Sequence, residues 1–293
     1  MSTQASLFIL VADIILRITA DRFHMKVQPK GAMKRFIVSP RKPDVDIQAL
    51  WGNLSQETSG KRIFDSGALW QLYQQNESYL FRFTSPAFGP GPYKTASFDD
   101  EFTQCKILLN ASSFRPDQPV YPFEYPLDEL AVIHFLATRQ GAEIHACGIL
   151  KPSGEAHLYV GQSGAGKTTI AKLHQKTGRV KILSDDRIVL RRRNHGIWMY
   201  GTPWHGEAEI ASPEKGRLTK IFFLRHGAEN KLVPLGKTEA VARLFTACFP
   251  PFYNQKAVEF ILAFLEEVVK TIPCHELTFL PDERVVAFIE RSP

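Results

Sequence analysis

A glycine-rich segment in the middle of the chain carries the residue types that bind a nucleoside triphosphate. Residues 159–173 read YVGQSGAGKTTIAKL, and Gly161, Gly166, Lys167 and Thr168 fit the pattern G-x-x-x-x-G-K-[ST]. Glycines let backbone N–H groups turn toward a phosphate, and the N-terminus of a following helix adds partial positive charge. The sequence therefore predicts a phosphate loop at residues 161–168. A glycine-rich turn that only caps a structural helix is the alternative.

Each part of this phosphate loop has an expected role. Backbone amides would cradle the phosphates, the Lys167 ammonium would neutralise the β- and γ-phosphates, and the Thr168 hydroxyl would coordinate Mg²⁺. ATP and Mg²⁺ are the cofactors that this interpretation requires. The residues expected to contact the nucleotide are Gly161, Gln162, Ser163, Gly164, Ala165, Gly166, Lys167, Thr168 and Thr169.

Two adjacent carboxylates follow the phosphate loop, in the segment VKILSDDRIVL (residues 180–190). Adjacent residues of an extended strand point to opposite faces, so only a local bend lets Asp185 and Asp186 serve one site. One carboxylate could then hold Mg²⁺, directly or through water, and the other could take a proton from a nucleophilic hydroxyl. The alternative is a turn pair between two strands with no chemical role.

The elements around these residues alternate as in α/β proteins. HLYV before the phosphate loop is typical of a strand and TTIAKLH after it of a helix. A helix is expected over 126–141, with Pro126 near its start and Gly141 past its end. The remaining strands are expected at 142–150, 156–161, 180–184, 187–193, 196–201, 218–224 and 275–281, and the remaining helices at 167–175, 237–247 and 257–271.

The first part of the chain has a different pattern. Short runs rich in β-branched and aromatic residues are separated by Gly, Pro, Asn and Asp, which predicts strands joined by turns. We therefore expect a β-rich N-terminal domain at residues 1–120 and an α/β catalytic-type domain at 121–293.

Composition narrows the functional classes. The 293 residues include 36 Lys and Arg against 30 Asp and Glu, a formal charge of +6. This excess suits anions such as ATP or an acidic peptide, but it is too small to indicate nucleic acid. Seven basic residues and no acidic one lie between Asp21 and Asp44, either as a solvated loop or as a docking site for an acidic peptide. They are Arg22, Lys26, Lys30, Lys34, Arg35, Arg41 and Lys42.

The N-terminal segment SLFILVADIILRI is apolar but contains Asp13 and Arg17. It lacks the features of a signal peptide and falls short of the ~20 residues that cross a bilayer, so we expect buried strands and no membrane association. Four widely spaced cysteines form no metal-binding pattern and are expected as buried free thiols rather than disulfides. A cytoplasmic location is the resulting expectation.

The segments IHACGIL, GQSGAGKTT, LSDDRIVL and GTPWHGE, in this order, resemble the HPr kinase/phosphorylase family and its related bacterial serine kinases, above all the HPr kinase-related subset. The resemblance covers roughly residues 126–230. It implies an α/β fold: a P-loop kinase core of the HPr kinase/phosphoenolpyruvate carboxykinase type, with mixed sheets, after a smaller β-rich N-terminal domain. Carboxykinases themselves are far longer than this chain.

The resemblance also implies roles for single residues. His145 matches a histidine that lies near the transferred phosphate in the family; a histidine buried in the core is the alternative. The family's Asp pair includes the catalytic base, and we assign Asp185 as that base and Asp186 to the metal.

This chain departs from the family at one motif. HPr kinases carry a Glu-x-Arg-Gly signature whose Glu helps to bind the metal, whereas this chain has TPWHGE. Glu207 is the candidate ligand here, and His205 or Trp204 would line the substrate site; a structural turn at Pro203 and Gly206 is the alternative. Without the signature there is no basis to expect the phosphorylase reaction or HPr as a partner.

Some basic residues near these motifs are weaker candidates. Arg187 and Arg225 could pair with the γ-phosphate or form surface salt bridges, and His226 follows an expected strand end close to the site. The run RRR at 191–193 is expected at a solvated strand edge.

The sequence and the resemblance together favour an ATP-dependent kinase that phosphorylates a hydroxyl, most readily a serine of a protein or peptide. A kinase of a small hydroxyl metabolite such as free serine is one alternative. Others are a module that binds ATP and a peptide without turnover, and NTPase or carboxykinase-like chemistry. HPr kinases assemble as hexamers, so a homo-oligomer is a further expectation from the resemblance.

Overall fold

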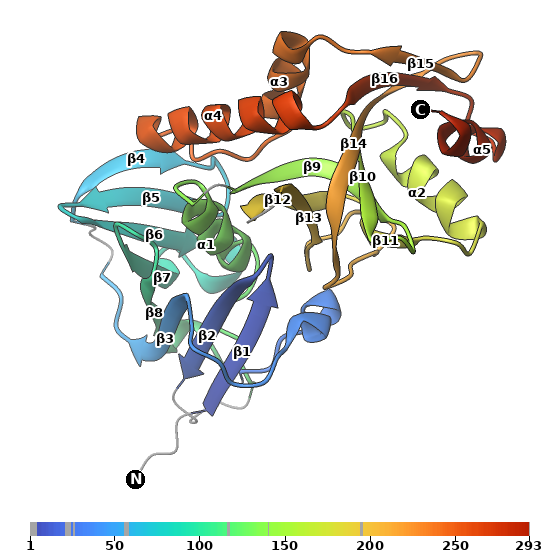
Figure 1. Cartoon of the computed structure of the whole chain (residues 1–293). Helices are drawn as coiled ribbons and strands as arrows, with labels where there is room; N and C mark the ends of the chain where they lie inside the picture. The colour runs from blue at the N-terminus through green and yellow to red at the C-terminus, as the bar shows by residue number, and fades with distance from the viewer. Residues whose placement is uncertain are drawn as a thin grey trace. The chain divides into compact units, whose positions relative to one another are not determined.

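The computed structural model describes residues 5–20, 25, 27–55, 59–115, 118–139, 141–193 and 196–292. The chain is a mixed α/β protein, mostly strands, with two large mixed sheets (Figure 1). It divides into two compact units, Met1–Phe135 and Leu136–Pro293. Of the seven basic residues between Asp21 and Asp44, Arg22 and Lys26 lie outside the described residues.

The first unit contains one eight-stranded sheet in the order β1-β2-β3-β8-β7-β6-β5-β4. β3 pairs in parallel with both β2 and β8, and the other neighbours are antiparallel. The strands are β1 (Ala5–Val11), β2 (Ile14–Ala20), β3 (Val45–Gly52), β4 (Lys61–Asp65), β5 (Trp70–Gln75), β6 (Ser78–Thr84), β7 (Pro92–Asp99) and β8 (Gln104–Asn110). Short 3₁₀ helices occupy Gly31–Phe36, Pro86–Phe88 and Ala111–Ser113.

The apolar N-terminal segment forms the antiparallel pair β1 and β2, which confirms the expectation of buried strands. Ala12 and Asp13 both have positive φ, 51° and 58°. Two central residues with φ > 0 form the tight hairpin turns whose twist matches that of the flanking strands. Alternate residues of β2, from Ile14 to Ala20, are buried, so one face of this hairpin belongs to the core.

Helix α1 (Leu127–Leu136) occupies most of the range expected from the sequence. Its His134 ring stacks on Phe102 with 4.4 Å between ring centroids and meets Phe81 edge-on at 5.4 Å. The two compact units divide between Phe135 and Leu136, so most of α1 belongs to the first unit. The sequence placed this helix at the start of the second domain because its own pattern does not show which core it packs against.

The second unit contains a sheet in the order β10-β9-β12-β13-β14-β16-β15. β10 also pairs in parallel with β14, which closes β10, β9, β12, β13 and β14 into a ring. β14 pairs in parallel with β16. The strands are β9 (Gly141–Leu150), β10 (Glu155–Val160), β11 (Lys181–Ser184), β12 (Arg187–Arg193), β13 (Gly196–Gly201), β14 (Lys215–His226), β15 (Lys231–Pro234) and β16 (Cys274–Phe279).

Helices cover this sheet through two separate apolar clusters. Helices α3 (Lys237–Thr246) and α4 (Gln255–Thr271) pack with the inward residues of the ring, including Ile144, Leu158 and Leu218. Helices α2 (Lys167–Lys176) and α5 (Arg284–Arg291) pack against Tyr159 and Phe222 on the other face (Figure 1). The strands and helices expected from the sequence in this part are confirmed, whereas β15 and α5 were not expected.

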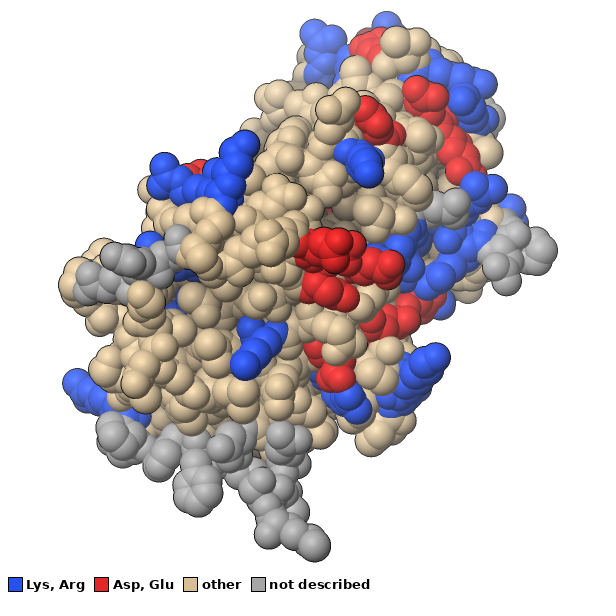
Figure 2. All heavy atoms as spheres, turned by 90° about the vertical axis from the view of Figure 1, so that its left-hand side faces the viewer, with Lys and Arg blue, Asp and Glu red and all other residues tan. Residues whose placement is uncertain are grey.

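Other expectations concern the surface and the thiols. All four cysteines are buried and free, as predicted. No helix within the described ranges combines the length and the apolar character that a bilayer crossing needs. On the face drawn in Figure 2, Lys and Arg side chains form several separate groups with Asp and Glu side chains between them.

Candidate functional site

The phosphate loop connects the end of β10 to the start of α2. Gly166 has φ +99° and stands directly before the helix, and Gly164 has φ +81°. A Cβ atom at position 166 would also lie 2.7 Å from Cζ of Phe279. Both the backbone angle and the close approach therefore require glycine at position 166.

This loop lies beyond the carboxyl ends of parallel strands. β10, β14 and β16 run parallel to one another. A Cβ atom at Gly161 would lie 3.4 Å from Cβ of Leu224 in β14, and one at Gly166 would touch Phe279 at the end of β16. Ligands of α/β sheets bind outside the carboxyl ends of such strands.

The first turn of α2 has free hydrogen-bond donors. The backbone amides of Lys167, Thr168 and Thr169 have no partner among the described residues, as expected for the first amides of a helix. The Lys167 Nζ atom donates to the carbonyls of Gly161 at 2.7 Å and Gln162 at 3.2 Å. Burial lowers the pKa of Lys167, and the negative charge of Asp186 partly offsets this effect. Together these donors can bind an anion with several oxygens.

Asp185 and Asp186, here called the carboxylate bend, lie between the end of β11 and the start of β12. The Ser184 hydroxyl holds the bend: it accepts from the amides of Asp186 at 3.2 Å and Arg187 at 3.1 Å and donates to the Trp204 carbonyl at 3.2 Å. Ala146 of β9 donates its amide to the Asp186 carbonyl at 3.1 Å. The local bend that two neighbouring carboxylates need is therefore present.

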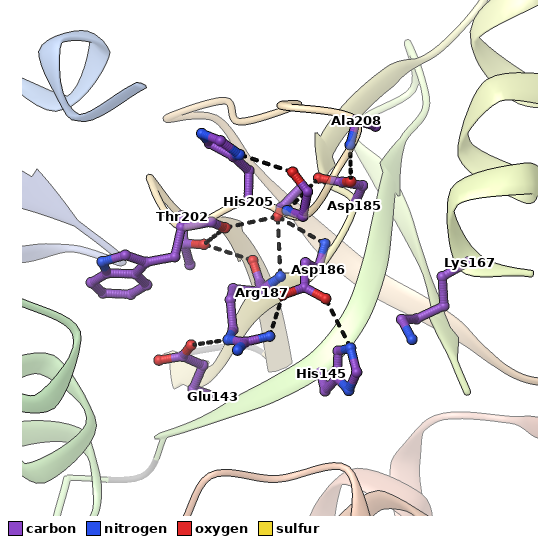
Figure 3. Close-up of polar contacts among 12 residues, drawn as sticks. Glu143, His145, Lys167, Asp185, Asp186, Arg187, Thr202, His205 and Ala208 are labelled. Atoms are coloured by element: carbon purple, nitrogen blue, oxygen red, sulfur yellow. Dashed lines mark hydrogen bonds and ion pairs between the residues drawn. The ribbon is translucent and has the colours of Figure 1, made fainter. Parts of the chain in front are cut away.

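The Asp185 carboxylate is buried, with 2% of the residue exposed. Its two oxygens accept the amides of Gly206 at 3.1 Å and Ala208 at 3.0 Å (Figure 3). A Cβ atom at position 206 would lie 2.9 Å from Oδ2 of Asp185. Asp185 thus fastens the segment that contains Glu207 to the carboxylate bend.

The Asp186 carboxylate is more accessible, with 24% of its side chain exposed. The His145 Nε2–H group donates to Oδ1 of Asp186 at 2.8 Å, and the Arg187 guanidinium pairs with the other oxygen (Figure 3). Burial alone would raise the pKa of Asp186, but the His145 hydrogen bond and the charges of Arg187 and Lys167 hold this pKa below its usual value. Asp186 therefore stays ionised at neutral pH.

Arg187 links this carboxylate to a buried acid. Its Nε atom lies 3.5 Å from Oε1 of Glu143, whose side chain is fully buried, and its guanidinium stacks on the Phe249 ring at 4.3 Å. Glu143 and His145 are two residues apart on β9 and so share one face of the strand. The register of the antiparallel pair β9 and β12 places Arg187 directly opposite His145. Phe249 reaches this network because its amide donates to the Glu143 carbonyl at 3.1 Å.

The phosphate loop and the carboxylate bend belong to one electrostatic environment. The charges of Asp186 and Asp185 both act on Lys167. Figure 3 shows the Lys167 side chain extending toward the side on which Asp186 and His145 lie. The geometry thus combines a loop with free backbone donors and a carboxylate held by two donors.

The residues expected to bind metal are not gathered into a cluster of side chains. No group of three or more His, Cys, Asp or Glu that could hold a metal ion occurs among the described residues. A magnesium ion at a phosphate loop takes most of its ligands from phosphate oxygens and water. The Thr168 hydroxyl, which has no partner in the described part of the chain, fits such an ion; the Asp186 carboxylate is accessible, but its oxygens already accept from His145 and Arg187.

The other candidates fall in different places. Glu207 and His205 are exposed, and the His205 ring lies 3.0 Å from the carbonyl of Gly206. Trp204 is buried, and its indole Nε1 has no partner in the described residues. Arg225 pairs with Glu276 at 3.4 Å on the surface.

Of the weaker basic candidates, one part of the RRR run differs from its expected position and His226 lies where it was expected. Arg191 of the RRR run is buried, with 6% exposed, so this position is not at a solvated edge as expected; Arg192 is exposed and pairs with Glu267. His226 does reach the phosphate loop, where its Nε2 atom lies 2.6 Å from the Gly164 carbonyl.

Three members of the site were not found from the sequence. The position of Glu143, two residues before His145, was a usable signal, because alternate residues of a strand share a face. Ser184 interrupts an apolar strand directly before the carboxylate bend. Phe249 carried no local signal, since only tertiary pairing brings it beside β9.

Comparison with protein-family models found no match, and no curated protein matches the sequence.

Proposed function

We propose that this protein is an ATP-dependent kinase that transfers the γ-phosphate of ATP to a hydroxyl, with a serine of a protein or peptide as the acceptor. The observation that supports this proposal is the pairing of an anion-binding loop with the ionised Asp186, which His145 and Arg187 hold beside it. The choice of serine rests on the resemblance to HPr kinase-related proteins.

The donor side of the reaction uses the phosphate loop. The free amides at the start of α2 bind phosphate oxygens, and the Lys167 ammonium turns from the Gly161 carbonyl to the β- and γ-phosphates. The Thr168 hydroxyl would help to hold Mg²⁺, which would supply further neutralisation of the phosphate charge. Positioning and charge neutralisation provide most of the catalysis in phosphoryl transfer.

The acceptor side uses the carboxylate bend. The serine hydroxyl donates its hydrogen bond to Asp186 and attacks the γ-phosphorus; the bond to the β,γ-bridging oxygen breaks and the proton passes to the carboxylate. A carboxylate with a low pKa is a weak base, but in a loose transition state it mainly orients the nucleophile. Arg187 and His145 lie beside Asp186 and so close to the negative charge that develops on the transferred phosphoryl group.

The geometry favours a different division of roles between the two aspartates from the one that the sequence suggested. Both oxygens of Asp185 already accept backbone amides, and this residue is buried. We therefore assign the acceptor proton to Asp186 and the anchoring of residues 206–208 to Asp185. Glu207, on the anchored segment, is free to approach a metal-bound triphosphate.

Mass spectrometry of the products tests this function. The protein is incubated with ATP, Mg²⁺ and serine-containing peptides, with free serine as a separate acceptor. We expect a phosphorylated serine peptide with the wild type, and no product together with weaker ATP binding for Lys167→Ala. ATP that is bound but left intact with every acceptor would instead indicate a non-catalytic binding module.

A further inference from the structure

His226 contacts the phosphate loop from outside its sequence. The residue ends β14, and its exposed imidazole places Nε2 2.6 Å from the Gly164 carbonyl oxygen. A carbonyl accepts only, so the Nε2–H group is the donor. This contact joins two segments that are far apart in the chain.

The loop rests on two residues at equivalent positions of neighbouring strands. His226 and Phe279 are direct partners in the parallel pairing of β14 and β16. Their rings lie 5.8 Å apart, and a Cβ atom at Gly166 would lie 2.7 Å from Phe279 Cζ and 3.4 Å from His226 Cε1. Phe279 therefore supports the loop at Gly166, and His226 holds it at Gly164.

The hydrogen bond of His226 acts on one particular peptide group. The Gly164 carbonyl and the Ala165 amide are the two ends of a single planar unit. The Ala165 amide donates to the Gln162 carbonyl at 3.0 Å, so the imidazole completes the hydrogen bonding of this unit. Gly164 has φ +81°, and no atom lies within 4 Å of the position that a Cβ would occupy, so side-chain packing does not restrain this residue. With both ends bonded, the peptide cannot rotate freely.

We propose that His226 is a positioning residue that holds the phosphate loop in the conformation that receives the triphosphate. This inference rests on the function proposed above. His226 does not touch the reacting atoms; it lowers the conformational entropy that the loop loses when ATP binds.

The first measurement is the affinity of the full-length protein for a fluorescent ATP analogue with Mg²⁺. His226→Ala removes the donor, and His226→Gln keeps an N–H donor of similar reach. Lys231→Ala is the control, because Lys231 is exposed on β15, which β16 separates from β14. We expect Kd to rise about three- to tenfold for His226→Ala, the range of one hydrogen bond, and to stay near the wild-type value for the other two variants.

The second measurement is amide hydrogen exchange of residues 159–170 without nucleotide. The amides of residues 159–170 should exchange faster in His226→Ala than in the wild type, with unchanged rates elsewhere. In kinetic assays of transfer, this variant should show a KM for ATP that is raised more than kcat is lowered. Equal affinity and equal exchange for His226→Ala and the wild type would overturn the inference while leaving the proposed function intact. A wild-type protein that binds no nucleotide would overturn both the proposed function and this inference. If amides throughout His226→Ala lose their protection from exchange, that variant is unfolded and His226→Gln decides the question. Low affinity of folded His226→Gln for the ATP analogue would then contradict the inference.

Discussion

At the scale of single residues, two adjacent aspartates differ because their hydrogen-bond partners differ. Asp185 is buried and accepts two backbone amides, whereas Asp186 is partly exposed and accepts from the His145 imidazole and the Arg187 guanidinium. Two identical side chains within one bend thus have different environments, which is the basis for proposing one as an anchor and the other as the residue that receives the acceptor proton. From the sequence and the resemblance both were placed at the site and the base was assigned to Asp185; the amides of Gly206 and Ala208 that occupy Asp185 could not be foreseen, because they come from a distant segment.

This difference predicts opposite results for two conservative variants. Asp186→Asn should lower transfer by about 100-fold or more, because the acceptor hydroxyl loses its base, with little change in ATP affinity. Asp185→Asn should instead lower the midpoint of thermal unfolding, since its N–H₂ group replaces one of the two acceptor oxygens and faces a backbone N–H, and a buried donor without a partner costs about 1–3 kcal/mol. Initial rates with labelled ATP and thermal melts measure both effects. Full activity in Asp186→Asn with inactivity in well-folded Asp185→Asn would restore the original assignment of the base.

At the scale of elements, the phosphate loop depends on the strand ends beside it. The motif, the strand before it and the helix after it were predictable, because glycine, lysine and hydrophobic periodicity are local signals. The contacts of Gly166 with Phe279 and of Gly164 with His226 were not, because they require the parallel pairing of β14 and β16. The bend at Asp185 likewise needed Ser184 and the partner strand β9.

Alanine substitutions at Gly164 and Gly166 separate the cost of a positive φ from the cost of a clash between the new Cβ atom and Phe279. Gly166→Ala should abolish binding of a fluorescent ATP analogue, because its Cβ atom would meet Phe279 at 2.7 Å in addition to the cost of φ +99°. Gly164→Ala has the same kind of backbone cost, about 1–2 kcal/mol, but open space, so it should weaken binding moderately. Equal affinities for the two variants would show that Phe279 does not limit the loop.

At the scale of the molecule, the two units were predictable to different degrees. Alternating strands and helices indicated the α/β unit, and short β-branched runs indicated the strands of the first unit. The order of those strands was not readable, since β3 pairs in parallel between β2 and β8, which are distant in sequence. Closure of the second sheet through β10 and β14 is also a long-range pairing.

Buried histidines give the whole molecule a pH dependence of stability. Burial lowers the pKa of His134 to about 4, of His157 to about 3 and of His174 to about 4. The unfolded chain, with histidine pKa values near ~6.5, binds more protons than the folded chain below that pH. The contribution of these buried histidines to the free energy of unfolding is therefore fully present above about pH 6.5 and is lost as the pH falls toward 4.

We predict that the free energy of unfolding falls by up to about 1.4 kcal/mol per pH unit for each of these histidines. Urea denaturation at pH 7.5, 6.5 and 5.5, values chosen to span this window, measures the slope. His157→Phe should reduce it, because the ring stays apolar beside Phe222, while the exposed His205→Gln should leave it unchanged. If the pH dependence of the free energy of unfolding has the same slope in His157→Phe as in the wild type, buried His157 is not a source of that dependence.

The most direct test of the kinase proposal is an experimental structure with a non-hydrolysable ATP analogue and Mg²⁺. We predict that the γ-phosphorus lies between the Lys167 ammonium and the Asp186 carboxylate, with phosphate oxygens on the first amides of α2. A triphosphate bound elsewhere, or an Asp186 side chain turned away from its terminal phosphate, would contradict the proposal.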